Sequence, residues 1–129
     1  MRVLLDTHAY LWWLADDADL SYEARDLLAD PRTTAYVSAA SVWEIAIKAK
    51  LGRLRLKGAV AMAEVVEVAG NEFLELPIRA RHAAAAGALP RHHDDPFDRM
   101  LVAQAQVEDL VLVTRDGKLG AYDVQIVEA

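Results

Sequence analysis

Short apolar runs alternate along this chain with longer stretches of helical character, and that alternation is what most restricts its fold. Residues 3–5 and 110–113 are unbroken apolar runs, whereas residues 96–107 form a well-marked helical stretch that begins at a proline. A short run without polar positions indicates a strand that is covered on both faces, as in a parallel sheet between layers of helices. The sequence therefore predicts an α/β fold built on a parallel sheet.

The polar residues inside the predicted strands also order the sheet. Strands are predicted at 3–5, 34–38, 73–76, 110–113 and 124–127, and helices at 9–15, 21–29, 41–51, 59–69, 79–86 and 96–107. Glu75 and Gln125 favour edge positions for the third and fifth strands, while the apolar first and fourth strands favour the centre. The order 3-2-1-4-5 satisfies this pattern, in a single domain over residues 1–129.

Composition excludes several classes of protein. The chain of 129 residues has no Cys, so it can form neither disulfides nor thiolate zinc sites. It shows no apolar run of membrane-spanning length and no signal peptide, so we expect a cytoplasmic protein. A net charge of −6 opposes nucleic-acid binding over the whole surface, although basic residues gather in a strip at 48–57. Such a strip is, taken alone, more often a solvated helix face.

Four carboxylates lie near the predicted strand ends, and each has an ordinary structural explanation. Asp6 can cap the first helix, Asp116 begins an Asp-Gly turn, and Glu44 fits a capping box that starts at Ser41. Asp98 falls in the first turn of the helix that begins at residue 96, where the helix dipole favours an acid. Taken singly, each acid is therefore better explained as a cap or a turn residue.

Taken together, the four acids indicate a metal site. In a parallel sheet the ligand crevice lies beyond the carboxyl ends of the strands, where the strand order reverses, here between strands one and four. Independent caps need not converge on that point, whereas metal ligands must. Crowded carboxylates repel one another unless a cation lies among them, and oxygen ligands without sulfur suit Mg²⁺ or Mn²⁺. The pattern therefore points to metal-dependent phosphodiester chemistry.

Several segments resemble the signature segments of PIN-domain ribonucleases, and more narrowly those of VapC-type toxins of bacterial toxin–antitoxin pairs. These segments are Asp6-Thr7, Ser41-Val42-Trp43-Glu44-Ile45, Lys50-Leu51-Gly52, His93-Asp94-Asp95-Pro96-Phe97-Asp98-Arg99 and Thr114-Arg115-Asp116. The resemblance implies a three-layer fold with five parallel strands and an acidic site at Asp6, Glu44, Asp98 and Asp116. That site would hold Mg²⁺ or Mn²⁺ and hydrolyse RNA to 5′-phosphate and 3′-hydroxyl ends.

The resemblance also implies supporting residues and partners. The residues expected to support the acids are Asp95, Thr114 and Thr7, and the candidate RNA contacts are Lys50, Arg53, Arg99 and Arg115. The implied partners are the RNA substrate, a VapB-like antitoxin and a second copy of the chain.

Other interpretations remain open. A non-catalytic module could keep the fold and bind only a protein partner. A phosphatase or phosphoacceptor site is disfavoured, because His8 stands where a dehalogenase-like site needs a second Asp. We expect His92 and His93 to face solvent, and the aromatic residues 10, 12 and 13 to divide between the core and a partner surface.

Overall fold

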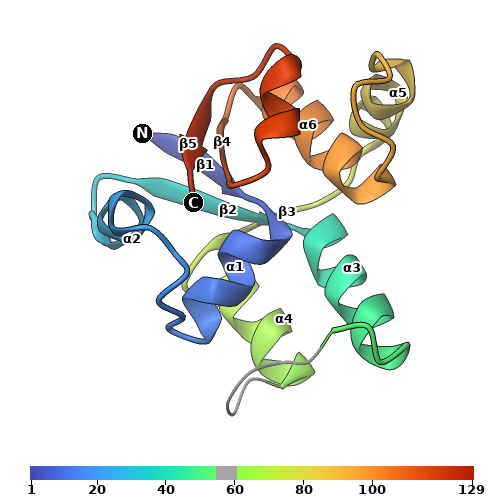
Figure 1. The fold of residues 1–129 in the computed structure, drawn as a ribbon. Helices are drawn as coiled ribbons and strands as arrows, with labels where there is room; N and C mark the ends of the chain where they lie inside the picture. Colours follow the sequence, from blue (N-terminus) through green and yellow to red (C-terminus); the bar gives the residue numbers. More distant parts are fainter. Residues whose placement is uncertain (55–60) are drawn as a thin grey trace.

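The computed structural model describes residues 1–54 and 61–129, which form a five-stranded parallel sheet of order β3-β2-β1-β4-β5 (Figure 1). The strands are β1 (Arg2–Leu5), β2 (Thr34–Ser38), β3 (Leu74–Leu76), β4 (Val111–Thr114) and β5 (Ile126–Glu128). In the central ladder, Leu4 lies opposite Tyr36 on one side and Leu112 on the other. The predicted strand order and the parallel arrangement are confirmed.

Helices cover both faces of the sheet, which confirms the predicted three layers (Figure 1). One layer holds α1 (Thr7–Leu14), α2 (Tyr22–Ala29), α3 (Ala39–Lys50) and α4 (Met62–Asn71), and the other holds α5 (Ala80–Ala88) and α6 (Pro96–Glu108). The short 3-10 helix η1 (Gly117–Ala121) follows β4. Among the described residues, no helix is both long enough and apolar enough to span a membrane.

Alternation along β1 divides its side chains between two cores. Val3 and Leu5 are fully buried in the core under α1, α2 and α4, which includes Tyr10, while Leu4 is fully buried against Leu101 of α6. The Tyr10 hydroxyl donates to the Val65 carbonyl at 2.5 Å, so this buried phenol has its hydrogen bond. Burial on both faces is why residues 3–5 of this strand are all apolar.

The three aromatic residues of α1 differ in how deeply they are buried. Tyr10 is fully buried, whereas Trp12 and Trp13 are partly buried and pack against the edge of the same core. The Trp13 ring meets Phe73 edge-on at 6.0 Å between centroids. Packing within the chain therefore explains much of why these three aromatic residues lie together, without a protein partner.

Some predicted helix ends differ from the structure. The prediction that Ser41 and Glu44 form a capping box is wrong, because Ser38 caps α3 and places both residues inside the helix. Gly87 does not end α5, which continues to Ala88. Gly52 does follow the end of α3 and has a φ of 70°, which favours glycine. The predicted start of the 59–69 helix lies partly outside the described residues, as do the basic positions 55 and 57.

Candidate active site

Asp6 leaves β1 at its carboxyl end and caps α1. Its side chain accepts from the Ala9 N–H at 2.8 Å and from the Thr114 hydroxyl at 2.6 Å. Burial raises the pKa of Asp6, and these two hydrogen bonds oppose that rise. Thr114, at the end of β4, therefore holds one carboxylate oxygen of Asp6 in place, as a supporting residue would.

Glu44 is a buried acid of α3 with both of its oxygens engaged. The Thr7 hydroxyl donates to Oε1 at 2.6 Å, and the Lys48 ammonium pairs with Oε2. Ser41 Oγ lies 3.1 Å from the same Thr7 hydroxyl. The hydrogen bond to Glu44 raises the pKa of Lys48, so the ammonium stays protonated beside the acid. Thr7 and Lys48 thus hold both carboxyl oxygens of Glu44 in place, because a buried polar group needs such partners.

Asp98 occupies the first turn of α6, but it does not cap that helix. Asp95 is the cap, and its Oδ1 accepts from the N–H groups of Phe97 at 2.8 Å and Asp98 at 3.1 Å. Burial, followed by the charges of Asp95 and Glu44, raises the pKa of Asp98 to about 7. The Asp98 carboxylate is therefore held among other acids with too little positive charge nearby.

Asp116 follows β4 and is joined to Asp98 by a histidine. Its Oδ1 accepts from the Lys118 N–H at 3.0 Å, while its Oδ2 lies 2.9 Å from His93 Nε2. The same His93 nitrogen is 3.4 Å from Asp98 Oδ2. Burial acts to raise the pKa of Asp116, but the hydrogen bonds from His93 and Lys118 outweigh it and lower that pKa.

The prediction that His93 faces solvent is wrong, because its side chain is only 13% exposed and lies between the two carboxylates. Its Nδ1 accepts from the Asp95 N–H at 3.1 Å, so in the neutral ring the proton is on Nε2. That N–H donates to Asp116. His93 therefore binds the two carboxylates together instead of offering a lone pair to a cation.

The donor groups at this edge of the sheet fit a hard divalent cation. Ligand atoms of His93, Asp98 and Asp116 lie within 4.8 Å of one another, although the proton on His93 leaves the two carboxylates as the ligands. Asp6 and Glu44 lie outside that group, yet the charge of each raises the pKa of Asp98, so they face the same site. Carboxylate oxygens without sulfur suit Mg²⁺ or Mn²⁺.

The model of the PIN-domain family matches residues 3–125. The chain belongs to the PIN-domain family. Its resemblance to this family, expected from the sequence, is confirmed. The PIN domain is also 32% identical over 121 residues to Ribonuclease VapC22 of Mycobacterium tuberculosis, a match that covers 93% of this chain and 91% of that protein.

Solved structures share the fold of this PIN domain across nearly its whole length. VapBC2 from Rickettsia felis, bound to a DNA fragment from its promoter, gives a TM-score of 0.72 at 16% identity and covers 98% of both chains. A toxin–antitoxin complex from Klebsiella pneumoniae gives 0.67 at 21% identity, covering 98% of this chain and 96% of the other. FitAcB from Neisseria gonorrhoeae gives 0.66 at 22% identity, covering 99% and 97%.

Arg99 of the PIN domain holds the loop that carries His93. Its guanidinium donates to the carbonyls of Ala86 and Leu89, both at 3.0 Å, and to those of Pro90 at 3.1 Å and His93 at 3.3 Å. A planar guanidinium presents several donors in fixed directions, which suits this set of acceptors. These contacts give Arg99 a structural function, and the RNA contact expected from the sequence stays a prediction.

Arg115 is similarly engaged, while two other candidate contacts are open. The Arg115 guanidinium donates to the Ala129 carbonyl at 3.0 and 2.7 Å and lies over the Trp12 ring at 4.4 Å. Lys50 and Arg53, by contrast, are exposed at the carboxyl end of α3. Lys50 and Arg53 are therefore the two candidate contacts that can be replaced without breaking the contacts described for Arg99 and Arg115.

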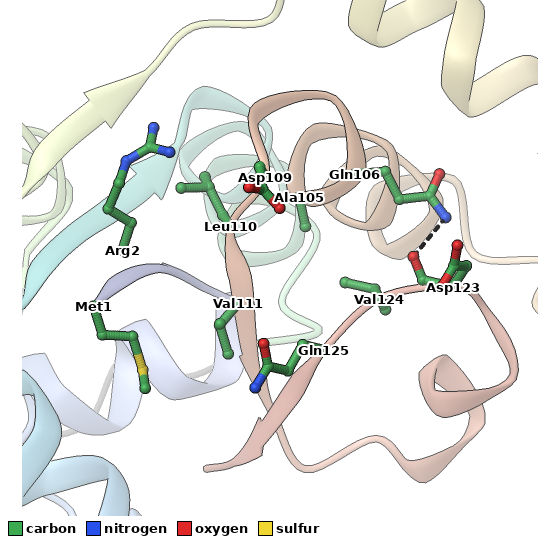
Figure 2. Close-up of a pocket in the computed structure, with 10 residues that line it drawn as sticks. All are labelled: Met1, Arg2, Ala105, Gln106, Asp109, Leu110, Val111, Asp123, Val124 and Gln125. Carbon is green, nitrogen blue, oxygen red and sulfur yellow. Dashed lines mark hydrogen bonds between the residues drawn. The ribbon is translucent and has the colours of Figure 1, made fainter.

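A wide hollow of about 840 Å³ lies at the amino ends of the strands, on the other side of the sheet from the acids (Figure 2). It is lined by residues at the starts of β1, β4 and β5 and at the end of α6, including Arg2, Asp109 and Asp123. The Gln106 amide donates to the Asp123 carbonyl across it at 3.1 Å. The acidic site lies beyond the carboxyl ends of the strands, where ligands of parallel sheets bind. This hollow lies at the amino ends of the strands and is therefore separate from it.

Proposed function

We propose that this PIN domain, over residues 1–129, is a metal-dependent endoribonuclease and the toxin of a toxin–antitoxin pair. The observation that carries the proposal is the convergence of ionisable acids at the carboxyl edge of the sheet, where the pKa of Asp98 rises to about 7. The likeness to a protein named Ribonuclease VapC22 supports RNA as the substrate. RNA as substrate also supports a cytoplasmic location.

Asp6, Asp98 and Asp116 would hold the Mg²⁺ or Mn²⁺ ion, and Glu44 would act through water because Lys48 and Thr7 engage it. When bound, the ion lowers the pKa of a coordinated water and neutralises charge that develops on the phosphate. The protein's own contribution is to hold these oxygens in place. Thr114 fixes Asp6, and the His93 ring fixes Asp116.

The alternative of a non-catalytic module is less consistent with the N-terminus of α6. If these acids served only as helix caps, Asp95 would be sufficient at this helix, because it already accepts from two backbone N–H groups. The Asp98 carboxylate adds a buried, poorly compensated charge to the same turn. Retaining such a destabilising group is expected of a functional site.

The proposed partners are a VapB-like antitoxin and a second copy of the chain. Support for the antitoxin comes from a solved structure of the same fold, the toxin–antitoxin complex from Klebsiella pneumoniae. The antitoxin would restrain the ribonuclease until it is released.

The first expected result is cleavage of RNA that requires a divalent cation. Purified protein freed of metal should cut a mixed RNA substrate on addition of Mg²⁺ or Mn²⁺, stop on addition of EDTA, and leave 5′-phosphate ends. The reason is that the clustered carboxylates cannot activate water or neutralise the phosphate without a cation. End-labelled RNA resolved on sequencing gels measures this. Equal cleavage in EDTA would contradict metal dependence, and no cleavage in either ion would contradict the activity.

A second expected result concerns substrate binding at the end of α3. The double variant Lys50→Ala/Arg53→Ala should bind single-stranded RNA about tenfold more weakly at 0.1 M salt, with a salt dependence shallower by about 1.4 in log–log slope, because two phosphate contacts are lost. Its stabilisation by metal should not change. Fluorescence anisotropy of labelled RNA at several salt concentrations measures both quantities.

The matched control is Arg2→Ala/Arg32→Ala, which removes the same charge at the opposite edge of the sheet. If both double variants bind RNA like the parent, Lys50 and Arg53 do not contact the substrate. If both weaken it equally, the effect is one of net charge.

A further inference from the structure

Trp43 and Phe97 form an aromatic pair beside the acidic site. Their ring centroids are 5.4 Å apart with an interplanar angle of 76°, so one ring meets the other edge-on. Trp43 directly precedes Glu44 on α3, and Phe97 directly precedes Asp98 on α6. The pair therefore joins the two helices at the point where each contributes an acid.

Packing within the chain does not explain why Trp43 is there. It is 60% exposed, and neither Trp43 nor Phe97 belongs to the two hydrophobic cores formed by the described residues. At that exposure, and with its ring steeply inclined to Phe97, the indole keeps most of its surface in water. Large aromatic side chains contribute most when they are covered, so an exposed indole beside an acidic site indicates a surface that meets a ligand.

The side chains next to Trp43 show which ligand fits. Trp43, Ile47 and Lys50 are spaced by four and three residues and lie on one face of α3. Lys50 is exposed about 10 Å along the helix axis from Trp43. An aromatic surface followed by a cation matches single-stranded nucleic acid, whose bases stack on aromatic rings and whose phosphates meet Lys or Arg.

We propose that the Trp43–Phe97 pair is a stacking site for one unpaired RNA base next to the bond that is cut. The inference rests on the proposed ribonuclease function and names the side chains that would meet its substrate. The indole supplies the stacking surface, Phe97 positions the indole against α6, and Lys50 meets a phosphate further along the strand. Duplex RNA cannot use the site, because its bases are stacked on each other.

The test measures binding separately from cleavage. In an Asp98→Asn background, which removes cleavage, single-stranded and duplex RNA oligonucleotides are titrated against Trp43→Ala, Trp43→Phe and the parent. Trp43→Ala should lose about tenfold or more in affinity for the single strand and little for the duplex, because one stacked base is lost. Trp43→Phe should keep most of the affinity but lose the quenching of tryptophan fluorescence that single-stranded RNA causes in the parent.

Tyr22→Ala is the matched control, because Tyr22 is an exposed aromatic residue on α2. Circular dichroism and sedimentation velocity on each variant establish folding and oligomeric state. Unchanged affinity of a folded Trp43→Ala for single-stranded RNA would overturn the inference even if the parent chain cleaves RNA. A change from dimer to monomer in Trp43→Ala, with RNA affinity retained, would overturn it in favour of self-association. Absence of cleavage by the parent, with Trp43-dependent binding intact, would instead contradict the proposed function.

Discussion

Replacing Asp98 by Asn is expected to stabilise the metal-free protein and to remove its response to divalent cations. Burial, Asp95 and Glu44 raise the pKa of Asp98 to about 7. Since the unfolded chain ionises near pH 4, the free energy of unfolding falls as the pH rises from about 4 through about 7, and the full penalty applies above it. Discounted for partial exposure, that penalty is on the order of 2 kcal/mol at pH 8. Asn avoids it.

Thermal unfolding at pH 8, with and without Mg²⁺ or Mn²⁺, measures this prediction. The parent should melt at a higher temperature when metal is added, whereas Asp98→Asn should start about 5 °C higher and gain nothing. Ribonuclease activity should fall by more than about a hundredfold, because even residues that only support metal ligands contribute 10- to 100-fold. Asp26→Asn, on the exposed face of α2, is the control. A less stable Asp98→Asn that still responds to metal would show that Asp98 is a structural residue.

Replacing Arg99 by Ala is expected to lower the free energy of unfolding by about 3 kcal/mol, because several buried or half-buried carbonyls lose a charged donor. The melting temperature should fall by about 10 °C. Arg99→Lys should recover little of this loss, because an ammonium cannot reach carbonyls that lie on several sides of a guanidinium. Activity should fall as well, since His93 lies in the loop that Arg99 holds.

The charge-conserving variant Arg99→Lys distinguishes a structural function of Arg99 from an RNA contact. If Arg99 bound a phosphate, Arg99→Lys would restore RNA affinity and neither variant would change the melting temperature. Arg91→Ala removes an equal charge from the exposed surface of the same loop and should change neither stability nor folding. Thermal unfolding and RNA anisotropy on the three variants decide between a structural and a substrate-binding Arg99.

The order of the sheet could be predicted from the sequence because burial on both faces leaves a clear pattern. Val3, Leu4 and Leu5 are all fully buried and all apolar, which marks the centre of the sheet. Glu75 is an exposed polar residue inside β3, which is an outermost strand of the sheet. Helix ends were less predictable where two residues could cap. Ser38 ends β2 and also caps α3, so the helix begins three residues before the capping-box pattern at Ser41.

The candidate acids could be picked out because parallel strands place their carboxyl ends together. Thr7 and Thr114, which hold two of these acids, were expected as supporting residues, whereas Lys48 and His93 were not. Lys48 lies four residues after Glu44 and could have been recognised as a helical ion pair. His93 could not, since its position depends on a loop path set by Arg99 and by the Tyr122 hydroxyl, which accepts from the His93 N–H at 3.0 Å. Neither contact has a periodic signal in the sequence.

Mapping of RNA 5′ ends in cells shows whether this PIN domain cuts RNA through its acidic site. RNA would be sequenced from cells that briefly express the chain or its Asp98→Asn variant, without antitoxin and at equal soluble levels. We expect discrete new 5′-phosphate ends with the parent chain and none with the variant. Identical end profiles from the two proteins would contradict this expectation and favour a module that only binds a partner.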